Sequence, residues 1–216
     1  LISGPTASGK SNFAVKVARK INGEIINADS MQIYKELSIL TARPKKLDQK
    51  KINHHLYGVI SVKKKFSTGS WLKLATKKIK EIKSLNKIPI LVGGTGLYFK
   101  SLTDGLVKIP SIPLKIRNET RSLQKKIGQK KFYEKLLKLD PLVKKNINPN
   151  DVQRSIRAFE IKKFTKKSIT EWFLNTEKNF NQNNFLKIYI DFPRQNLVKL
   201  IKERVNQMFA EDVISE

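Results

Sequence analysis

Hydrophobic residues gather along this chain into short runs that are separated by longer amphipathic stretches. The short runs are bounded by turn-forming residues and predict strands at 1–3, 24–28, 56–60, 88–92 and 186–191. Apolar residues that recur every three or four positions predict helices over 10–21, about 70–85 and 194–209. Strands that alternate with helices in this way indicate an α/β fold with a mainly parallel sheet flanked by helices.

The middle of the chain contains no convincing strand. Residues 105–114 are rich in proline and short apolar residues, which is typical of a connector. Farther along, Asp140 stands directly before a proline, and both Asp140 and Asp151 are suited to cap the N-terminus of a helix. We therefore predict a mostly helical insertion over 115–184, which ends in an asparagine-rich mobile loop over 175–184.

This insertion would divide the α/β core into two pieces, 1–114 and 185–216. The chain begins without methionine inside a predicted strand and stops just after a predicted helix. We therefore expect the core to lack a C-terminal piece.

Positive charge is abundant and unevenly distributed. The chain has 44 Lys and Arg residues against 18 Asp and Glu, a formal net charge of +26. Residues 115–167 alone hold 17 basic and 5 acidic side chains, which is +12 in 53 residues. Clustered positive charge favours polyanionic partners through counterion release. A genome biased toward lysine codons would instead scatter lysines over solvated surfaces, and the basic background leaves that explanation open.

Other classes of protein are disfavoured by what the sequence lacks. Cysteine is absent, which excludes disulfides and thiolate metal sites and fits an enzyme of the cytoplasm. There is no signal peptide and no apolar run long enough to cross a bilayer. We therefore expect a cytoplasmic protein with no membrane association, and a monomer, because no pattern suggests a dimer interface.

Residues 4–11 match the phosphate-binding loop G-x-x-x-x-G-K-[ST] at every fixed position. In such a loop, glycines let successive N–H groups turn toward phosphate oxygens, and the following helix adds its positive end. Lys10 adds a full charge and Ser11 a hydroxyl that suits Mg²⁺. With the α/β pattern, the loop predicts a P-loop NTPase-like sheet but does not say whose phosphates it binds. The predicted phosphate ligands are Gly4, Pro5, Thr6, Ala7, Ser8, Gly9, Lys10 and Ser11.

Two further loops follow predicted strands and should face the same crevice, because ligands bind outside the carboxyl ends of parallel strands. Asp29 could hold Mg²⁺ through water, act as a general base, or only cap the next helix. Thr95 lies in a glycine-rich turn, 93–96, and can present a hydroxyl and an N–H to an anion.

Three other features are ambiguous from the residues alone. Arg154 and Arg157 share one face of a predicted helix, which suits phosphate or base edges but also an ordinary solvated face. His54 and His55 are adjacent without a third metal ligand nearby, which favours a structural role. Asp191 ends an apolar strand, as the Mg²⁺-binding Asp of a kinase would.

The order and spacing of these residues resemble the bacterial tRNA dimethylallyltransferases of the isopentenyltransferase family. That family prenylates the adenosine next to the anticodon. The resemblance covers nearly the whole chain in the blocks GPTASGKS (4–11), NADSMQIY (27–34), LTARP (40–44), HHL (54–56), VGGTGLY (92–98), NPNDVQRSIRAFEI (148–161) and Arg204-Val205 with Met208.

The resemblance implies that loop 4–11 holds the diphosphate of dimethylallyl diphosphate, with Mg²⁺ near Ser11. It implies that Lys10 and Thr95 stabilise the leaving diphosphate and that Asp29 is the general base for the N6 amino group of adenine. It further implies that the basic insertion binds the anticodon stem-loop. The positions that match tRNA contacts are Asp29, Ser30, Met31, Gln32, Thr95, Arg117, Gln153, Arg154, Ser155, Ile156 and Arg157.

The implied reaction transfers a dimethylallyl group to N6 of the adenosine 3′ to the anticodon and releases diphosphate. Since the base must leave its stack to react, the adenine is expected to enter the crevice. Gly58 departs from an acidic residue that many relatives carry after HHL, and Asp212 departs from an expected glycine. Rival hypotheses are an adenylate isopentenyltransferase acting on free AMP, an ATP-dependent kinase using Asp191, and a non-enzymatic RNA-binding protein.

Overall fold

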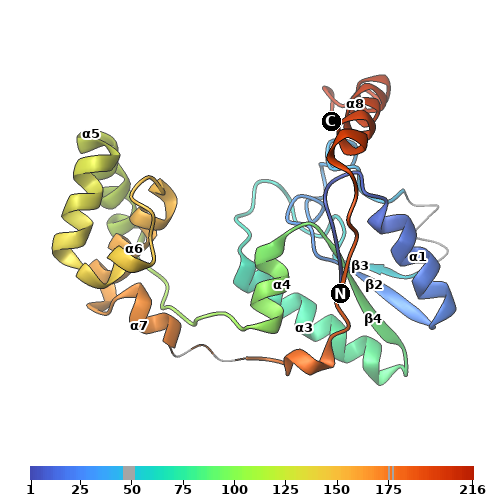
Figure 1. Cartoon of the computed structure of the whole chain (residues 1–216), viewed down its shortest axis with the longest axis horizontal. Helices are drawn as coiled ribbons and strands as arrows, with labels where there is room; N and C mark the ends of the chain where they lie inside the picture. The colour runs from blue at the N-terminus through green and yellow to red at the C-terminus, as the bar shows by residue number, and fades with distance from the viewer. Residues whose placement is uncertain (46–51, 175, 177) are drawn as a thin grey trace. The chain divides into compact units, whose positions relative to one another are not determined.

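The protein divides into two compact units in the computed structural model, which describes residues 1–45, 52–174, 176 and 178–216. The α/β unit comprises Leu1–Gly105 and Lys178–Glu216. The helical unit comprises Leu106–Glu177. Figure 1 shows the elements of both units along the chain.

The α/β unit is built on a five-stranded parallel sheet whose order is β3-β2-β4-β1-β5. The longest pairing joins β2 to β4 and runs in parallel from Gly23 opposite Ile88 to Asn27 opposite Val92. This arrangement confirms the predicted α/β fold with a parallel sheet. The strands are β1 (Ile2–Ser3), β2 (Gly23–Asn27), β3 (His54–His55), β4 (Ile88–Gly93) and β5 (Ile188–Tyr189).

Helices cover both faces of the sheet. Because successive strand residues point to opposite faces, Ile25 packs with α1 (Lys10–Lys20) while Ile26 is buried on the other side. The helices α3 (Thr68–Ser84) and α4 (Gly96–Thr103) lie on that second side (Figure 1). Near-continuous burial along β2 fits a strand that is covered on both faces.

The predicted strand at 56–60 is wrong in its position. The paired residues are His54 and His55, and the strand ends because Leu56 takes a left-handed backbone with φ 63°. This turn is held by the side chain of Asn27, whose amide donates to the Leu56 carbonyl over 3.1 Å. In the described residues, an isolated parallel bridge between Tyr34 and Ile60 follows.

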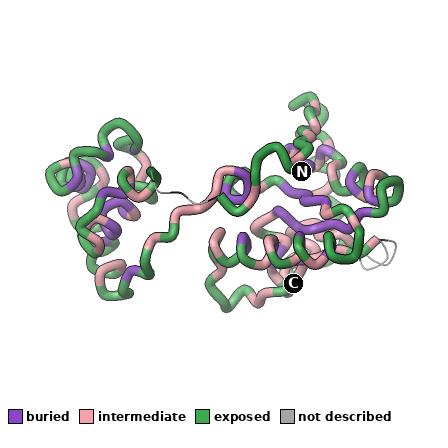
Figure 2. Tube along the Cα trace, turned by 90° about the horizontal axis from the view of Figure 1, so that it is seen from below, coloured by how far each residue is buried: buried purple, intermediate pink, exposed green. Residues whose placement is uncertain are grey.

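The helical unit packs around a core of its own, to which the expected connector also contributes Ile112. Figure 2 shows its buried residues on the inward faces of the helices. The mostly helical character predicted for this part of the chain is confirmed. Its elements are α5 (Leu114–Leu139), the 3-10 helix η1 (Pro141–Lys145), α6 (Val152–Thr165) and α7 (Ile169–Leu174).

The two predicted caps of this unit have different outcomes. Asp151 caps α6 as expected, because its carboxylate accepts the N–H of Arg154 over 2.9 Å. Asp140 precedes η1, but its carboxylate makes no capping bond and is wholly buried, with no hydrogen-bond partner among the residues described. The helix start predicted at Asp140 is therefore right, while the capping role predicted for the Asp140 side chain is wrong.

The chain closes with η2 (Gln182–Asn184) and the helix α8 (Arg194–Ala210), both in the α/β unit. The predicted loop at 175–184 falls partly outside the described residues, and η2 forms its last part. No residue of α8 is buried. Within the ranges given above, no helix combines the length and apolar character needed to cross a bilayer.

Candidate active site

The loop over residues 4–11 contains two left-handed residues and leads directly into a helix. It leaves β1, passes through left-handed backbones at Ala7 (φ 64°) and Gly9 (φ 78°), and enters α1 at Lys10. A left-handed backbone costs a non-glycine residue free energy, so its presence at Ala7 marks a geometry set by the surrounding structure. The Lys10 ammonium donates to the Pro5 carbonyl over 3.1 Å, which folds the lysine back over the loop.

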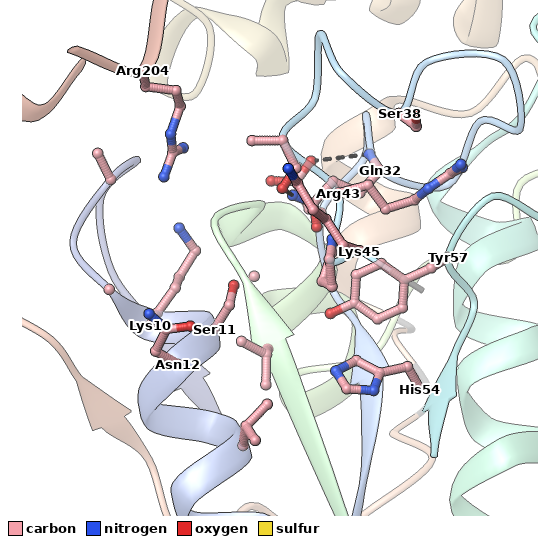
Figure 3. Close-up of a pocket in the computed structure, with 18 of the residues that line it drawn as sticks. Lys10, Ser11, Asn12, Gln32, Ser38, Arg43, Lys45, His54, Tyr57 and Arg204 are labelled. Carbon is pink, nitrogen blue, oxygen red and sulfur yellow. Dashed lines mark hydrogen bonds between the residues drawn. The ribbon is translucent and has the colours of Figure 1, made fainter. Parts of the chain in front are cut away.

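A cavity of about 950 Å³ lies against this loop. Lys10 and Ser11 border it on one side, and Asp29 and Gln32 come from the loop after β2 (Figure 3). Its lining includes more cations than acids, which suits a polyanionic ligand. The lining cations are Lys10, Lys16, Arg19, Arg43, Lys45 and Arg204, and the acids are Asp29 and Glu211.

Close backbone contact brings the loops after β2 and β4 together. A Cβ atom added to Gly93 would lie 2.1 Å from the carbonyl oxygen of Ala28, so only glycine fits at this position. The N–H of Thr95 donates to the same carbonyl over 3.2 Å. The Thr95 hydroxyl accepts the N–H of Ser30 over 2.9 Å. Thr95 is therefore fixed beside the Asp29 loop, although it does not line the cavity.

Asp29 is anchored through one of its two carboxylate oxygens. Oδ1 accepts the N–H of Met31 over 2.9 Å and that of Gln32 over 3.4 Å. Asn27 holds the backbone of the same turn, because its Oδ1 accepts the N–H of Asp29 over 2.8 Å. Asp29 thus closes a turn through Oδ1 and caps no helix, because none begins directly after it in the described residues. Oδ2 has no hydrogen bond within the described part of the chain, which leaves it able to take a proton.

Arg204 is a functional candidate to which the sequence assigned no role. It lies on α8, and Figure 3 shows its guanidinium pointing toward the ammonium of Lys10 across the cavity. Burial lowers the pKa of Lys10, the charge of Asp29 raises it, and the charge of Arg204 lowers it further. Two neighbouring cations are stabilised by an anion bound between them. Only the three-dimensional structure could reveal this pair, because 194 positions separate the two residues.

The cavity also has an apolar and aromatic wall. Tyr57 lines it with Val15 and Val92, and the Tyr57 ring meets the His54 ring edge-on with centroids 5.6 Å apart. Burial, followed by the charge of Asp29, raises the pKa of Tyr57. The phenol therefore stays protonated and can donate a hydrogen bond into the cavity.

Several predicted site residues lie apart from this cavity. Gly4 and Pro5 line a second cavity of about 610 Å³, together with Gly94 and Gly96. Ser8 is buried, and its hydroxyl has no partner in the described structure. Thr6, Ser30 and Met31 line neither cavity.

Neither His55 nor Asp191 belongs to the site. His55 shares a hydrogen bond of 2.6 Å with the buried carboxylate of Glu24, which confirms the structural role expected for it. Asp191 is exposed, lines neither cavity, and accepts the N–H of Phe192. The kinase hypothesis is therefore not favoured.

The remaining candidates lie in the helical unit. Gln153, Arg154 and Arg157 present exposed or partly exposed side chains near the start of α6. Ser155 and Ile156 are buried, with Ser155 donating to the Asp151 carbonyl over 2.7 Å. These two side chains face the core of the helical unit rather than its surface. Arg117 lies on α5 and is partly exposed.

The described residues hold no group of three or more His, Asp or Glu side chains that could bind a metal by themselves. Ser11 and Asp29 both line the cavity and offer oxygen atoms, the ligands that Mg²⁺ prefers. Mg²⁺ commonly uses one or two protein oxygens together with substrate phosphates. The residues present therefore fit Mg²⁺ bound jointly with a diphosphate.

Comparison with known proteins agrees with this geometry. A family model described as IPP transferase matches residues 32–216. The chain is 62% identical over 216 residues to a tRNA dimethylallyltransferase of Pelagibacter ubique (strain HTCC1062), covering all of the chain and 69% of that relative. It is 46% identical over 217 residues to a tRNA dimethylallyltransferase of Rickettsia massiliae (strain Mtu5), again along its whole length but over 60% of that relative.

Solved structures show the same similarity. A eukaryotic dimethylallyltransferase acting on tRNA superimposes with a TM-score of 0.83 at 28% identity, over 99% of this chain and 53% of the other. A tRNA isopentenylpyrophosphate transferase from Bacillus halodurans gives a TM-score of 0.62 at 33% identity, over 99% of this chain and 66% of the other. Given the family model over most of its length and a relative at 62% identity, the chain belongs to the IPP transferase family.

Proposed function

We propose that this chain carries the catalytic core of a tRNA dimethylallyltransferase. Its substrates are dimethylallyl diphosphate and the adenosine 3′ to the anticodon. The bond between the allylic carbon and the diphosphate oxygen breaks, and a bond from that carbon to N6 of adenine forms. N6 loses one proton, and diphosphate leaves with the electron pair of the broken bond. The observation that carries this proposal is the convergence of Lys10 and Asp29 on one basic cavity.

The phosphate loop supplies stabilisation of the leaving group. An adenine amino group is a weak nucleophile because its lone pair is delocalised into the ring. The reaction therefore depends on easy departure of diphosphate, whose growing negative charge must be stabilised. Lys10 and Arg204 place two cations at the loop, and the N-terminus of α1 adds its dipole. Mg²⁺ held through Ser11 would neutralise further phosphate charge.

Asp29 would receive the proton of N6. Its Oδ1 is held by two backbone N–H groups, so the carboxylate cannot rotate freely, and its Oδ2 has no competing hydrogen bond in the described structure. Thr95 bonds to the neighbouring N–H of Ser30 through its oxygen, which leaves its hydroxyl hydrogen available to a phosphate oxygen. The apolar wall formed by Val15, Val92 and Tyr57 suits the prenyl group.

The helical unit supports tRNA rather than free AMP as the acceptor. Arg154 is 73% exposed in its side chain, and the start of α6 also presents Gln153 and Arg157. A lone nucleotide would need no such basic surface, whereas a stem-loop presents many phosphates to it. We therefore assign Gln153, Arg154, Arg157 and Arg117 to contact with the anticodon stem-loop.

Labelled prenyl transfer tests the proposal. A version of the protein with the full length of its relatives is incubated with radiolabelled dimethylallyl diphosphate, Mg²⁺ and either unmodified tRNA or AMP. We expect label in tRNA alone. Label in AMP would instead support the adenylate isopentenyltransferase, and label in neither would refute both transferases. Mixing with EDTA tests the metal, and we expect transfer to fall sharply when Mg²⁺ is removed.

We further propose that the enzyme works in the cytoplasm as a monomer. Lys10, Asp29 and Thr95 all come from one α/β unit, so no residue of a second copy is needed to complete the proposed site. Sedimentation of the protein with tRNA should give a 1:1 complex. A 2:2 complex would overturn this part of the proposal.

A further inference from the structure

The side-chain carboxylate of Glu216 occupies an anion-binding turn beside the proposed site. The backbone N–H groups of Ser38, Ile39 and Leu40 point to the side chain of Glu216. Ile39 donates to Oε1 over 2.7 Å, and Leu40 donates to Oε2 over 2.9 Å. Successive N–H groups that converge in this way form a nest for an anion. We call residues 38–40 the amide nest.

The pKa of Glu216 is consistent with hydrogen bonding of its carboxylate to the amide nest. Partial burial tends to raise the pKa of Glu216, but the N–H groups of Leu40, Ile39 and Ser38 outweigh it and lower the pKa. Hydrogen bonds to a charged acceptor are stronger than bonds between neutral groups. The nest therefore holds the ionised form of this carboxylate.

The nest belongs to a tightly hydrogen-bonded turn that contacts Gln32. The N–H of Arg43 donates to the Ser38 carbonyl over 3.0 Å, and Ala42 takes a left-handed backbone with φ 48°. The Gln32 amide donates to the carbonyls of Thr41, over 2.9 Å, and Ala42, over 3.2 Å. The position of Gln32 thus depends on the turn that Glu216 holds.

Gln32 is hydrogen-bonded to Asp29. Its backbone N–H donates to Asp29 Oδ1 over 3.4 Å, and the turn from 29 to 32 is closed by that carboxylate. Hydrogen bonds therefore connect Glu216 to the amide nest, Ile39 of the nest to Ala42, Ala42 to Gln32, and Gln32 to Asp29. A second contact joins the same two segments, because Lys45 and Glu211 form an ion pair of 3.0 Å.

We infer that Glu216 is a positioning residue for prenyl transfer, which holds the amide nest and through it the orientation of Gln32 and Asp29. This inference rests on the proposed function of the site. Glu216 touches neither substrate in this role. Its loss should slow transfer to tRNA while leaving the affinity for dimethylallyl diphosphate unchanged, because Lys10 and the phosphate loop are not part of this chain of bonds.

Chemical rescue tests the inference in the full-length protein. Glu216→Ala empties the nest, and we expect kcat/KM for tRNA to fall about tenfold, as suits the loss of hydrogen bonds to a charged group. Sodium formate should restore much of the activity by filling the nest, whereas sodium chloride at equal ionic strength should not. Glu203→Ala is the matched control, since Glu203 is an exposed carboxylate of α8 with no contact to the nest.

Amide hydrogen exchange provides a readout that does not need catalysis. Exchange at Ser38, Ile39 and Leu40 should accelerate in Glu216→Ala, return toward the wild-type rate in formate, and stay unchanged in Glu203→Ala. Unchanged exchange in Glu216→Ala would overturn the inference, as would a loss of activity that formate does not restore. If the wild-type protein transferred no label, the proposed function would fail, while the exchange measurement would still test the hold of Glu216 on the nest.

Discussion

The two units of this protein reach stability and function by different means. In the described residues of the α/β unit, six non-glycine residues have a positive φ, and polar side chains such as Asn27 hold irregular loops at the ends of strands. In the described residues of the helical unit, Lys166 alone of the non-glycine residues has a positive φ, and regular helices pack around an apolar core. The α/β unit carries its candidate catalytic residues in fixed loops, whereas the helical unit presents basic side chains on the surface of packed helices.

From this difference we expect the two units to tolerate different substitutions. Chemistry that needs a carboxylate, a lysine and several N–H groups in one cavity depends on backbone positions fixed to within a fraction of an ångström. Binding to a phosphate backbone needs charge at roughly the right place and tolerates small displacements. We therefore expect single changes in the α/β unit to abolish transfer, and single surface changes in the helical unit only to weaken binding.

The largest expected effect is on catalysis. Asp29→Asn keeps the shape of the side chain but removes its basicity, so kcat for transfer should fall by about 10²–10⁴. The dissociation constant for tRNA should change little, because we propose that most of the binding comes from the helical unit. Single-turnover transfer and filter binding measure the two quantities.

Asp191→Asn is the matched control, because it removes another strand-end carboxylate of the same unit that lines neither cavity. It should leave both quantities unchanged. An equal loss of tRNA binding and of transfer in Asp29→Asn would argue against the role of Asp29 as general base.

The second prediction concerns stability and tests whether the two units have separate hydrophobic cores. Phe132 is fully buried in the helical unit and packs on Phe159 with ring centroids 5.2 Å apart. Phe132→Ala should destabilise this unit by about 3–5 kcal/mol. Amide exchange should rise in α6, while the amides of β4 keep their protection. Phe173→Ala, at an exposed aromatic residue of the same unit, should change neither.

Loss of protection in β4 as well as in α6 would mean that the two units unfold as one, and the comparison between them would then fail.

The third effect concerns the pH dependence of the α/β unit. Burial tends to raise the pKa of Glu24, but hydrogen bonds from Lys87, His55 and Asn53 lower it to about 2. Because the folded pKa lies below the ordinary 4.5, this carboxylate stabilises the fold above about pH 4.5 and loses its contribution as the pH falls toward 2. Glu24→Gln should therefore cost about 2–3 kcal/mol at pH 7 and much less at pH 2.

Urea unfolding at several pH values measures this difference. Glu119→Gln is the control in the helical unit, since its exposed carboxylate pairs with Lys163 at the surface. Glu119→Gln should change the pH dependence of the free energy of unfolding only slightly. A Glu24→Gln protein whose stability keeps the pH dependence of the wild type would contradict the assignment.

The smallest effect is on tRNA affinity. Arg154→Ala removes one cation, so it should weaken tRNA binding severalfold and reduce the slope of log K against log salt by about 0.7–0.9. Titrations at several salt concentrations give this slope. Lys20→Ala removes an exposed cation at the end of α1 and should leave the slope unchanged. Equal effects of both changes would indicate binding by overall charge and would restore the scattered-lysine explanation.

Much of the fold could be predicted because local signals agree with it. The glycine pattern of 4–11, the buried runs of β2 and β4, and the cap at Asp151 each follow from short-range chemistry. The misplaced strand shows the limit of such signals. Leu56 has an apolar side chain that suits a strand, but the amide of Asn27 holds its carbonyl in a turn. Asp140 is similar, because its capping pattern is outweighed by burial.

Local sequence patterns were enough to identify the groups available for chemistry: a phosphate loop with Lys10 and Ser11, a strand-end Asp29, and a basic helical segment. They could do so because each signal lies within a few neighbouring residues. Which distant residues lie together could be seen only in the three-dimensional fold. It placed Arg204 opposite Lys10 and Glu216 in the amide nest, since these contacts depend on how α8 lies against loops far away in the chain. Periodicity and spacing carry no record of such contacts.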